Sequence, residues 1–191
     1  MSKPQEPASS LRPRWARPGL EIWLVRHGET DWTASGRLNG WTDTILSDRG
    51  RLQAGALHKE LAHSQPAQAW TSDLRRCQET AQLAGLEATA DTRLRELDFG
   101  ELEGAAWNQL SPTHRQWLRD FDQFVAPGGE SVTELKARVH AFLADLDSGR
   151  HIIVTHGGVI RLICRELRRD QHICPGTLTK LTSLSPRRGR E

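Results

Sequence analysis

Short apolar runs alternate with longer amphipathic segments along this chain, and this alternation limits the possible folds more than any other feature. The apolar run at 22–25 has the length of a buried strand, and two further short strands are predicted at 68–71 and 151–155. Strands that alternate with helices are typical of a largely parallel sheet covered by helices on both faces. The sequence therefore predicts an α/β fold, a three-layer α/β/α sandwich with a mostly parallel central sheet.

Serine residues mark where the predicted helices begin. Ser47 and Ser72 each precede an apolar pattern and are suitable N-caps, and the helix after Ser47 is expected to bury Leu52, Ala56, Leu57 and Leu61. Ser131 and Glu134 have the spacing of a capping box. The helix after this box has the clearest apolar stripe, at Val132, Leu135, Val139, Phe142, Leu143 and Leu146. The stretch 105–124 is expected to be mostly helical.

The two ends of the chain differ in composition from its middle. Residues 1–19 are rich in proline and polar residues and predict a flexible leader, while residues 186–191 form a basic tail. An alternating stretch at 177–184 is interpreted as a short edge strand. Residues 20–185 are then expected to form one domain, since their number suits a single hydrophobic core.

Composition excludes several classes of protein. The chain is 37% apolar and 26% charged, as in a globular protein, and its net charge of +2 is too small to indicate a nucleic-acid or membrane partner. It has neither a signal-peptide core nor an apolar run long enough to span a membrane. Its three cysteines, at 77, 164 and 174, form no Cys-x-x-Cys pair. These features favour a cytoplasmic protein with free thiols, and they leave the oligomeric state open.

Two segments share one design, in which a predicted strand is followed by histidine and then glycine. His27 and Gly28 follow the first strand, and His156 and Gly157 follow the last long one. Ligands of α/β proteins bind at the carboxyl ends of the strands, where glycine lets backbone N–H groups approach an anion. The sequence thus predicts an anion site that two imidazoles face.

Arginine supplies the positive charge near these segments. Arg26 precedes the first histidine, Arg37 lies ten residues after it, and Arg76 follows the second predicted strand. A guanidinium donates two parallel hydrogen bonds to phosphate oxygens, which a lysine cannot do. Taken singly, each residue apart from His27 could serve in packing or lie in solvent. Taken together, they indicate a phosphate site.

A metal site is not expected at these histidines. Both lie among arginines that would repel a cation, and the carboxylate ligands of a metal cluster are lacking beside them. P-loop and kinase signatures are also absent from the sequence. We therefore expect no metal and no cofactor.

The motifs resemble those of the histidine phosphatase superfamily, which contains cofactor-dependent phosphoglycerate mutases and many small phosphatases. The resemblance runs in order from about residue 20 to residue 167. It is carried by Arg26-His27-Gly28-Glu29-Thr30, Gly40-Trp41-Thr42-Asp43, Leu46-Ser47-Asp48-Arg49-Gly50, Thr71-Ser72-Asp73-Leu74-Arg75-Arg76, Arg95-Glu96-Leu97-Asp98-Phe99-Gly100, Pro127-Gly128-Gly129-Glu130-Ser131 and Thr155-His156-Gly157. It implies a phosphoglycerate mutase-like fold and a single histidine phosphatase domain.

The resemblance also implies roles for individual residues. His27 becomes phosphorylated, while Arg26, Arg76 and His156 hold the phosphate, and Glu96 donates the proton to the leaving group. Gly157 and Arg37 are further candidates for substrate binding. The family usually has asparagine six residues after the nucleophile, where this chain has Thr33. A threonine hydroxyl can also donate a hydrogen bond to phosphate, but from a shorter side chain.

Three functions remain open from the sequence. A phosphomonoester hydrolase that acts on a small phosphorylated metabolite is favoured. Its substrate is expected to be α-ribazole 5'-phosphate or a sugar phosphate, because the chain most resembles the compact α-ribazole phosphatases. A cofactor-dependent phosphoglycerate mutase is the alternative, although such mutases carry extra sequence between the motifs of Glu96 and His156. The third is a phosphate-binding protein that has lost turnover, against which the retained site residues argue.

Overall fold

The structure is a computed structural model that describes residues 13–62, 68–169 and 173–181. It has the predicted α/β architecture, with one central sheet. Its five strands lie in the order β3-β2-β4-β1-β5. β1 to β4 are parallel to one another, and β5 pairs with β1 in the antiparallel sense. The strands are β1 (Leu20–Arg26), β2 (Gln68–Thr71), β3 (Ala88–Ala90), β4 (Gly149–Thr155) and β5 (Leu178–Leu181).

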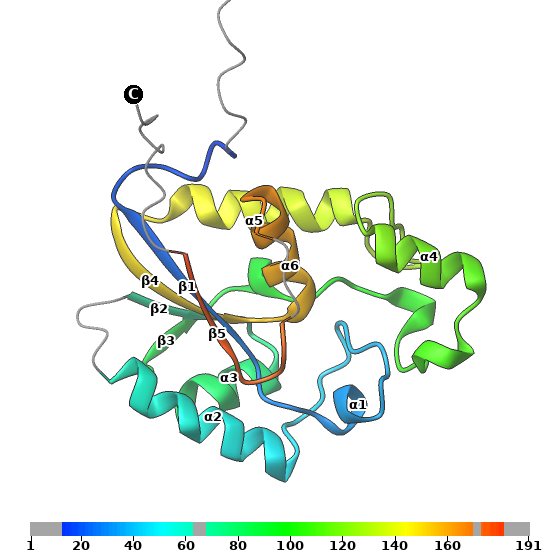
Figure 1. Ribbon diagram of the computed structural model, residues 1–191, viewed down its shortest axis with the longest axis horizontal. Helices are drawn as coiled ribbons and strands as arrows, with labels where there is room; N and C mark the ends of the chain where they lie inside the picture. Colours follow the sequence, from blue (N-terminus) through cyan, green and yellow to red (C-terminus); the bar gives the residue numbers. More distant parts are fainter. Residues whose placement is uncertain (1–12, 63–67, 170–172, 182–191) are drawn as a thin grey trace, which may run out of the picture.

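Helices cover both faces of the sheet (Figure 1), which confirms the three-layer prediction. α5 and α6 lie on one face, α2 and α3 lie on the other, and α1 and α4 lie beyond the sheet on the right of the view. The helices are α1 (Asp31–Ala34), α2 (Asp48–Leu61), α3 (Arg75–Leu83), α4 (Pro112–Asp120), α5 (Val132–Asp145) and α6 (Gly157–Glu166), with 3-10 turns η1 (Thr92–Leu94), η2 (Gly100–Leu102) and η3 (Trp107–Gln109).

Alternate residues of β1 belong to different parts of the core. Ile22 and Leu24 pack in the cluster that includes the apolar stripe of α5 and the inner side of α6. Trp23 and Val25 pack in a second cluster with residues of α2 and α3. Successive side chains of a strand point to opposite faces of the sheet, so a strand that is apolar at every position is buried on both sides.

Two of the three predicted N-cap serines are confirmed. Ser47 caps α2 through the Gly50 amide, and Ser131 and Glu134 form the capping box of α5. Ser72 does not cap α3, because that helix begins at Arg75 with Leu74 in the N-cap position. The Ser72 hydroxyl accepts a weak hydrogen bond from the Leu74 amide inside the preceding turn.

The fold corrects the prediction for α2, and it contains one strand that the sequence did not predict. Leu52 of α2 is 76% exposed and Ala56 is also exposed, whereas Ala54 is buried because the helix turns a different side to the sheet. Within 105–124 the predicted helical structure is provided by α4 and the short η3 turn. β3 was not predicted, since its sequence Ala-Thr-Ala has no apolar run to distinguish it from a loop.

The ordered domain begins earlier than the expected leader allows. Trp15 is buried in the core, and its indole N–H donates to Glu166 of α6, so the chain from Pro13 to Gly19 packs against the domain. The rest of the leader, the basic tail at 186–191 and the end of the predicted edge strand lie outside the described residues. Within the described ranges, no helix is long and apolar enough to cross a membrane.

Candidate active site

The parallel pairing of β1 and β4 brings the two strand-end histidines together. Arg26 lies opposite Thr155 in the register, and the His27 amide donates to the Thr155 carbonyl at 3.0 Å. His27 and His156 follow these positions directly, and their ring centroids are 5.1 Å apart. Both rings are buried. The two motifs therefore form one site, as the sequence predicted.

The Gly28 carbonyl fixes the tautomer of His27. It lies 2.7 Å from the ring atom Nδ1 and can only accept a hydrogen bond, so Nδ1 carries the proton and Nε2 keeps its lone pair. The turn that makes this contact is tight, since a Cβ on Gly28 would lie 2.3 Å from the Gly50 carbonyl oxygen. The Gly28 amide also donates to the Thr80 hydroxyl at 3.0 Å. The histidine is thus held between α2 and α3.

Both histidines are kept neutral by their surroundings. Burial is the main cause that lowers the pKa of His27 well below its usual value, and the charges of Arg76 and Arg26 lower it further. Burial and the same arginines also lower the pKa of His156. Each cause disfavours a positive charge on the ring. A neutral imidazole is the form that can act as a nucleophile.

His156 lies against a buried thiol. Cys77 Sγ is 3.4 Å from its Nε2 atom and 3.6 Å from the Thr155 carbonyl oxygen. Burial raises the pKa of Cys77 well above its usual value, so the sulfur stays a thiol. Cys77 therefore packs against the site as a neutral group, and the predicted burial of Cys77 and Cys164 is confirmed.

Two guanidinium groups lie next to His27, that of the fully buried Arg76 and that of the half-buried Arg26. Arg76 donates to the carbonyls of Thr42 and Gly40, and Arg26 donates to the carbonyl of Ile173. The Nε atom of each arginine is buried with no hydrogen-bond partner in the described part of the chain. Burial lowers the pKa of both arginines, but a guanidinium remains protonated in proteins. Unsatisfied cationic donors of this kind indicate a site for an anion.

A cleft of about 680 Å³ opens over these groups. Arg26, His27, Glu96 and Gly157 form its polar part. Thr33, Arg37, Asn39, Gly158 and Arg161 also line it, and its apolar lining consists of Leu38, Leu97, Phe99, Trp107, Leu118, Phe121 and Ile173. Arg76 and His156 are fully buried and are not part of this lining. The lining of the cleft thus offers charged groups for a phosphate and apolar side chains for an organic group.

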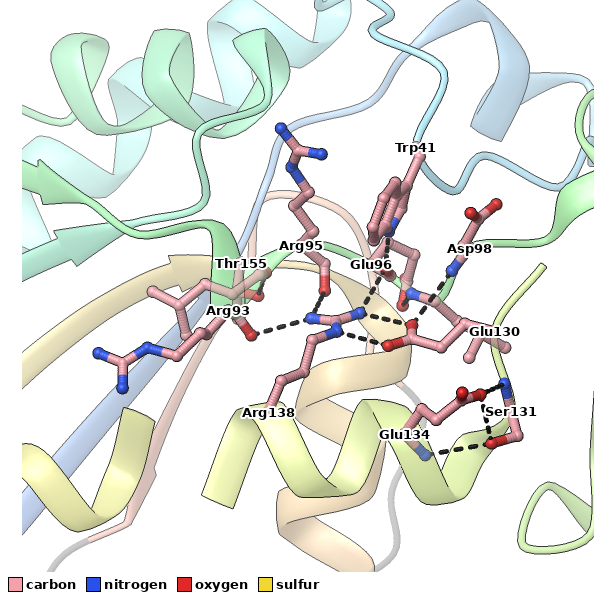
Figure 2. A network of polar contacts seen from close by, with 12 residues as sticks. Trp41, Arg93, Arg95, Glu96, Asp98, Glu130, Ser131, Glu134, Arg138 and Thr155 are labelled. Carbon is pink, nitrogen blue, oxygen red and sulfur yellow. Dashed lines mark hydrogen bonds and ion pairs between the residues drawn. The ribbon is translucent and has the colours of Figure 1, made fainter. Parts of the chain in front are cut away.

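Glu96 is held by backbone groups on two elements. Its Oε1 atom accepts from the Leu97 amide and its Oε2 atom from the Gly158 amide of α6, both at 2.9 Å. The carbonyl of Glu96 accepts from the Trp41 indole at 2.8 Å and from Arg138 at 2.7 Å, as Figure 2 shows. The carboxyl group is therefore fixed in the wall of the cleft that contains His27.

Thr33 and Arg37 line the cleft, and each makes hydrogen bonds to the protein backbone. The Thr33 hydroxyl donates to the Thr30 carbonyl at 3.0 Å and accepts from the Thr30 amide at 2.8 Å, which completes the capping box of α1. Arg37 is exposed and donates to the Gly104 carbonyl at 2.9 Å. The exposure of Arg37 distinguishes it from Arg76, which is fully buried.

The sequence did not single out Arg138, Arg161 or Asn39. Arg161 of α6 and Asn39 line the cleft, and Arg138 of α5 binds the segment that contains Glu96. The sequence does contain a feature that points to Arg138, which lies three residues after Leu135 and next to Val139 on the apolar side of its helix. A charged residue in such a position is buried only with partners. Among the described residues, no group of three or more histidine, cysteine or acidic side chains could hold a metal ion.

Comparisons with known proteins agree with this arrangement. Residues 22–187 match the model of the histidine phosphatase superfamily (branch 1). A relative named "Probable phosphoglycerate mutase GpmB" from Salmonella paratyphi C is 38% identical over 150 residues, which cover 72% of this chain and 70% of the relative.

Two solved structures are also similar. The protein TTHB049 from Thermus thermophilus is 42% identical with a TM-score of 0.80, and the match covers 85% of this chain and 93% of that one. A protein described as "a putative alpha-ribazole-5'-P phosphatase" from Escherichia coli K-12 is 30% identical with a TM-score of 0.69, over 76% and 78% of the two chains. From its motifs, its fold and the model match, the chain belongs to the histidine phosphatase superfamily.

Proposed function

We propose that this protein hydrolyses the phosphomonoester of a small metabolite through a phosphohistidine on His27. The observation that carries the proposal is the state of His27. Its Nδ1–H is bound to the Gly28 carbonyl, its ring is neutral, and its Nε2 atom has a lone pair beside two guanidinium groups. This is the arrangement that a nucleophile for phosphorus requires.

The reaction has two steps. In the first, the His27 Nε2 lone pair forms a bond to phosphorus, the bond from phosphorus to the leaving oxygen breaks, and Glu96 gives its proton to that oxygen. In the second, water attacks phosphorus, the bond from phosphorus to Nε2 breaks with its electron pair returning to the ring, and Glu96 takes the proton from the water. Arg26, Arg76 and His156 stabilise the charge on the phosphoryl oxygens in both steps.

The wall of the cleft supports an organic leaving group of moderate size. Trp107 and Phe121 are among the apolar side chains of its lining, and Arg37 and Arg161 add hydrogen-bond donors. A ring with hydroxyl groups suits such a mixed surface. α-Ribazole 5'-phosphate and sugar phosphates are the substrates that we propose, and the name of the Escherichia coli relative supports the first.

A phosphoglycerate mutase is the second candidate, and the name of the Salmonella relative favours it. The two reactions share the phosphohistidine and differ in the acceptor, which is water for the hydrolase and a second hydroxyl group for the mutase. Hydrolysis is favoured because only short elements, η2, η3 and α4, lie between Glu96 and α5, which leaves little chain to exclude water.

A substrate screen tests the proposal. The protein is assayed for phosphate release from α-ribazole 5'-phosphate, sugar phosphates, nucleotides and phosphoglycerates, and phosphoglycerates are also assayed for isomerisation. We expect release of inorganic phosphate, with the highest kcat/KM on a substrate whose leaving group contains a ring. Isomerisation faster than phosphate release would support the mutase, and neither reaction on any substrate would overturn the proposal.

A further inference from the structure

A charged residue on the apolar side of α5 binds the backbone beside the cleft. The Arg138 side chain is 16% exposed, although it lies on the side of the helix that packs Leu135, Val139 and Phe142 into the core. A guanidinium in such a place loses most of its water and has to be compensated by hydrogen bonds. The contacts that compensate it are all on or next to the segment that carries Glu96.

Arg138 uses each nitrogen of its guanidinium group. Nη1 donates to the carbonyls of Arg93 and Arg95 at 2.8 and 2.6 Å, and Nη2 donates to the carbonyl of Glu96 at 2.7 Å. Nε and Nη2 pair with the Glu130 carboxylate at 2.7 and 2.8 Å. Figure 2 shows the guanidinium between Glu130 and these three carbonyls.

This cluster also fixes the backbone on the far side of Glu96. Glu130 Oε2 accepts from the Asp98 amide at 3.4 Å, and the Glu130 amide donates to the Asp98 carbonyl at 3.0 Å. The backbone is therefore bound from position 93 to position 98, and Glu96 lies inside this stretch. A glutamate side chain rotates about three bonds, so the place of its carboxyl group depends on a fixed backbone as well as on the Leu97 and Gly158 amides.

We propose that Arg138 is a positioning residue for Glu96, which holds the carboxyl group where the leaving oxygen departs. Arg138 does not line the cleft and acts through the backbone of residues 93–96. The inference rests on the proposed function, because it concerns the proton that Glu96 supplies. It requires arginine itself, since the planar fork reaches three carbonyls and a carboxylate together, whereas a lysine ammonium is one point of contact.

The test compares Arg138→Lys and Arg138→Met with Lys136→Met. Lys136 lies on the same helix and pairs with Glu166, away from Glu96, so its variant controls for the loss of an ion pair from α5. Each variant is assayed with an alkyl phosphate, whose leaving group needs a proton, and with 4-nitrophenyl phosphate, whose leaving group does not. Hydrogen exchange of the Leu97 and Gly158 amides reports the position of the carboxyl group without any turnover.

We expect Arg138→Lys to lower kcat on the alkyl phosphate by roughly ten- to a hundred-fold, since small displacements of a catalytic group have effects of that order. The aryl phosphate rate should change by less than about three-fold. The Leu97 and Gly158 amides should exchange faster, and Lys136→Met should behave like the unmodified protein. Arg138→Met repeats the test without a positive charge.

Equal losses of kcat on both substrates, together with unchanged hydrogen exchange of the two amides, would overturn the inference. Arg138 would then have a structural role only. If Arg138→Met does not fold, Arg138→Lys decides the question. If the unmodified protein hydrolyses neither substrate, the proposed function has failed. The amide exchange then still shows whether Arg138 positions Glu96.

Discussion

At the scale of single residues, the neutral state of His27 links the chemistry of the site to the stability of the protein. The ring stays neutral because it is buried beside Arg76 and Arg26, which lower its pKa. The same causes lower the pKa of His156. A histidine that takes up a proton more readily in the unfolded chain than in the folded one makes folding depend on pH.

The first prediction follows from this linkage. Below about pH 6.5 the unfolded chain protonates both histidines and the folded protein does not. The free energy of unfolding should therefore fall as the pH falls from 6.5 towards 5.5, by up to about 1.4 kcal/mol per pH unit for each histidine. Urea unfolding at closely spaced pH values measures the slope, and His27→Gln should reduce it by about one proton. An equal slope in the variant would contradict the account.

The second prediction concerns Thr33, which the sequence suggested as a phosphate donor. Its hydroxyl has one proton and gives it to the Thr30 carbonyl, so the capping box of α1 is its role in this structure. Thr33→Ala should lower the free energy of unfolding by about 1 kcal/mol, as the loss of a cap does. It should change kcat/KM by less than about three-fold. A loss of ten-fold or more at unchanged stability would return Thr33 to the phosphate site.

At the scale of elements, the site depends on the close approach of the start of α6 to Glu96. Gly158 donates its amide to the Glu96 carboxyl group, and a Cβ at this position would lie 2.2 Å from Oε1. A side chain cannot be accommodated at that distance unless the carboxyl group moves. The glycine is thus required by the position of Glu96.

The third prediction is that Gly158→Ala impairs proton donation. Its kcat on alkyl phosphates should fall at least about ten-fold, as expected for a displaced general acid. Gly55→Ala is the matched control, because Gly55 is also helical and has nothing within 4 Å of an added Cβ. That variant should gain about 0.5–1 kcal/mol of stability and keep its activity. Full activity of Gly158→Ala on alkyl phosphates would contradict the assigned role of Glu96.

Elements with strong local signals were predictable from the sequence. β1 and β4 contain unbroken apolar runs, and the capping box of Ser131 and Glu134 is a local feature that needs no tertiary contact. The failures have physical causes. Leu52 matched a helical pattern, but which side of α2 faces the sheet is decided by packing, and the irregular chain around α4 is held by long-range contacts such as Arg161 to the Leu118 carbonyl.

The site residues were named from the motifs, and the structure brings His27, His156, Arg26 and Arg76 together. The role of Arg138 could not be found in the same way, because its carbonyl partners have no sequence signature. A hydrogen bond to a backbone carbonyl depends on the path of the chain and not on the residue type. The same holds for the Gly28 carbonyl that fixes the tautomer of His27.

At the scale of the whole molecule, the sheet order places the chemistry. β4 and β1 are central neighbours, so the turns after them meet at one edge of the sheet, and α3 brings Arg76 to the same edge. Helices cover both faces of the sheet (Figure 1), and both histidines are buried. The result is a buried cationic floor under an open cleft, which suits an anionic substrate.

The fourth prediction is that activity does not depend on a metal ion. In the proposed function Arg26 and Arg76 balance the charge on phosphate, and the same arginines would repel a cation at His27. Phosphate release should persist after prolonged dialysis against EDTA, with a rate within about two-fold of the untreated protein. A loss that Mg²⁺ or Zn²⁺ restores would show that a metal ion takes part.

The measurement that tests the central claim most directly is the capture of phosphate on His27. The protein is mixed with excess substrate, denatured under alkaline conditions within the first turnover, and analysed by peptide mass spectrometry and ³¹P NMR. We predict one phosphoryl group on His27 at Nε2, because Nδ1 is bound to the Gly28 carbonyl, and neither label nor turnover in His27→Ala. Phosphate on another residue or on Nδ1, or turnover by His27→Ala, would contradict the account.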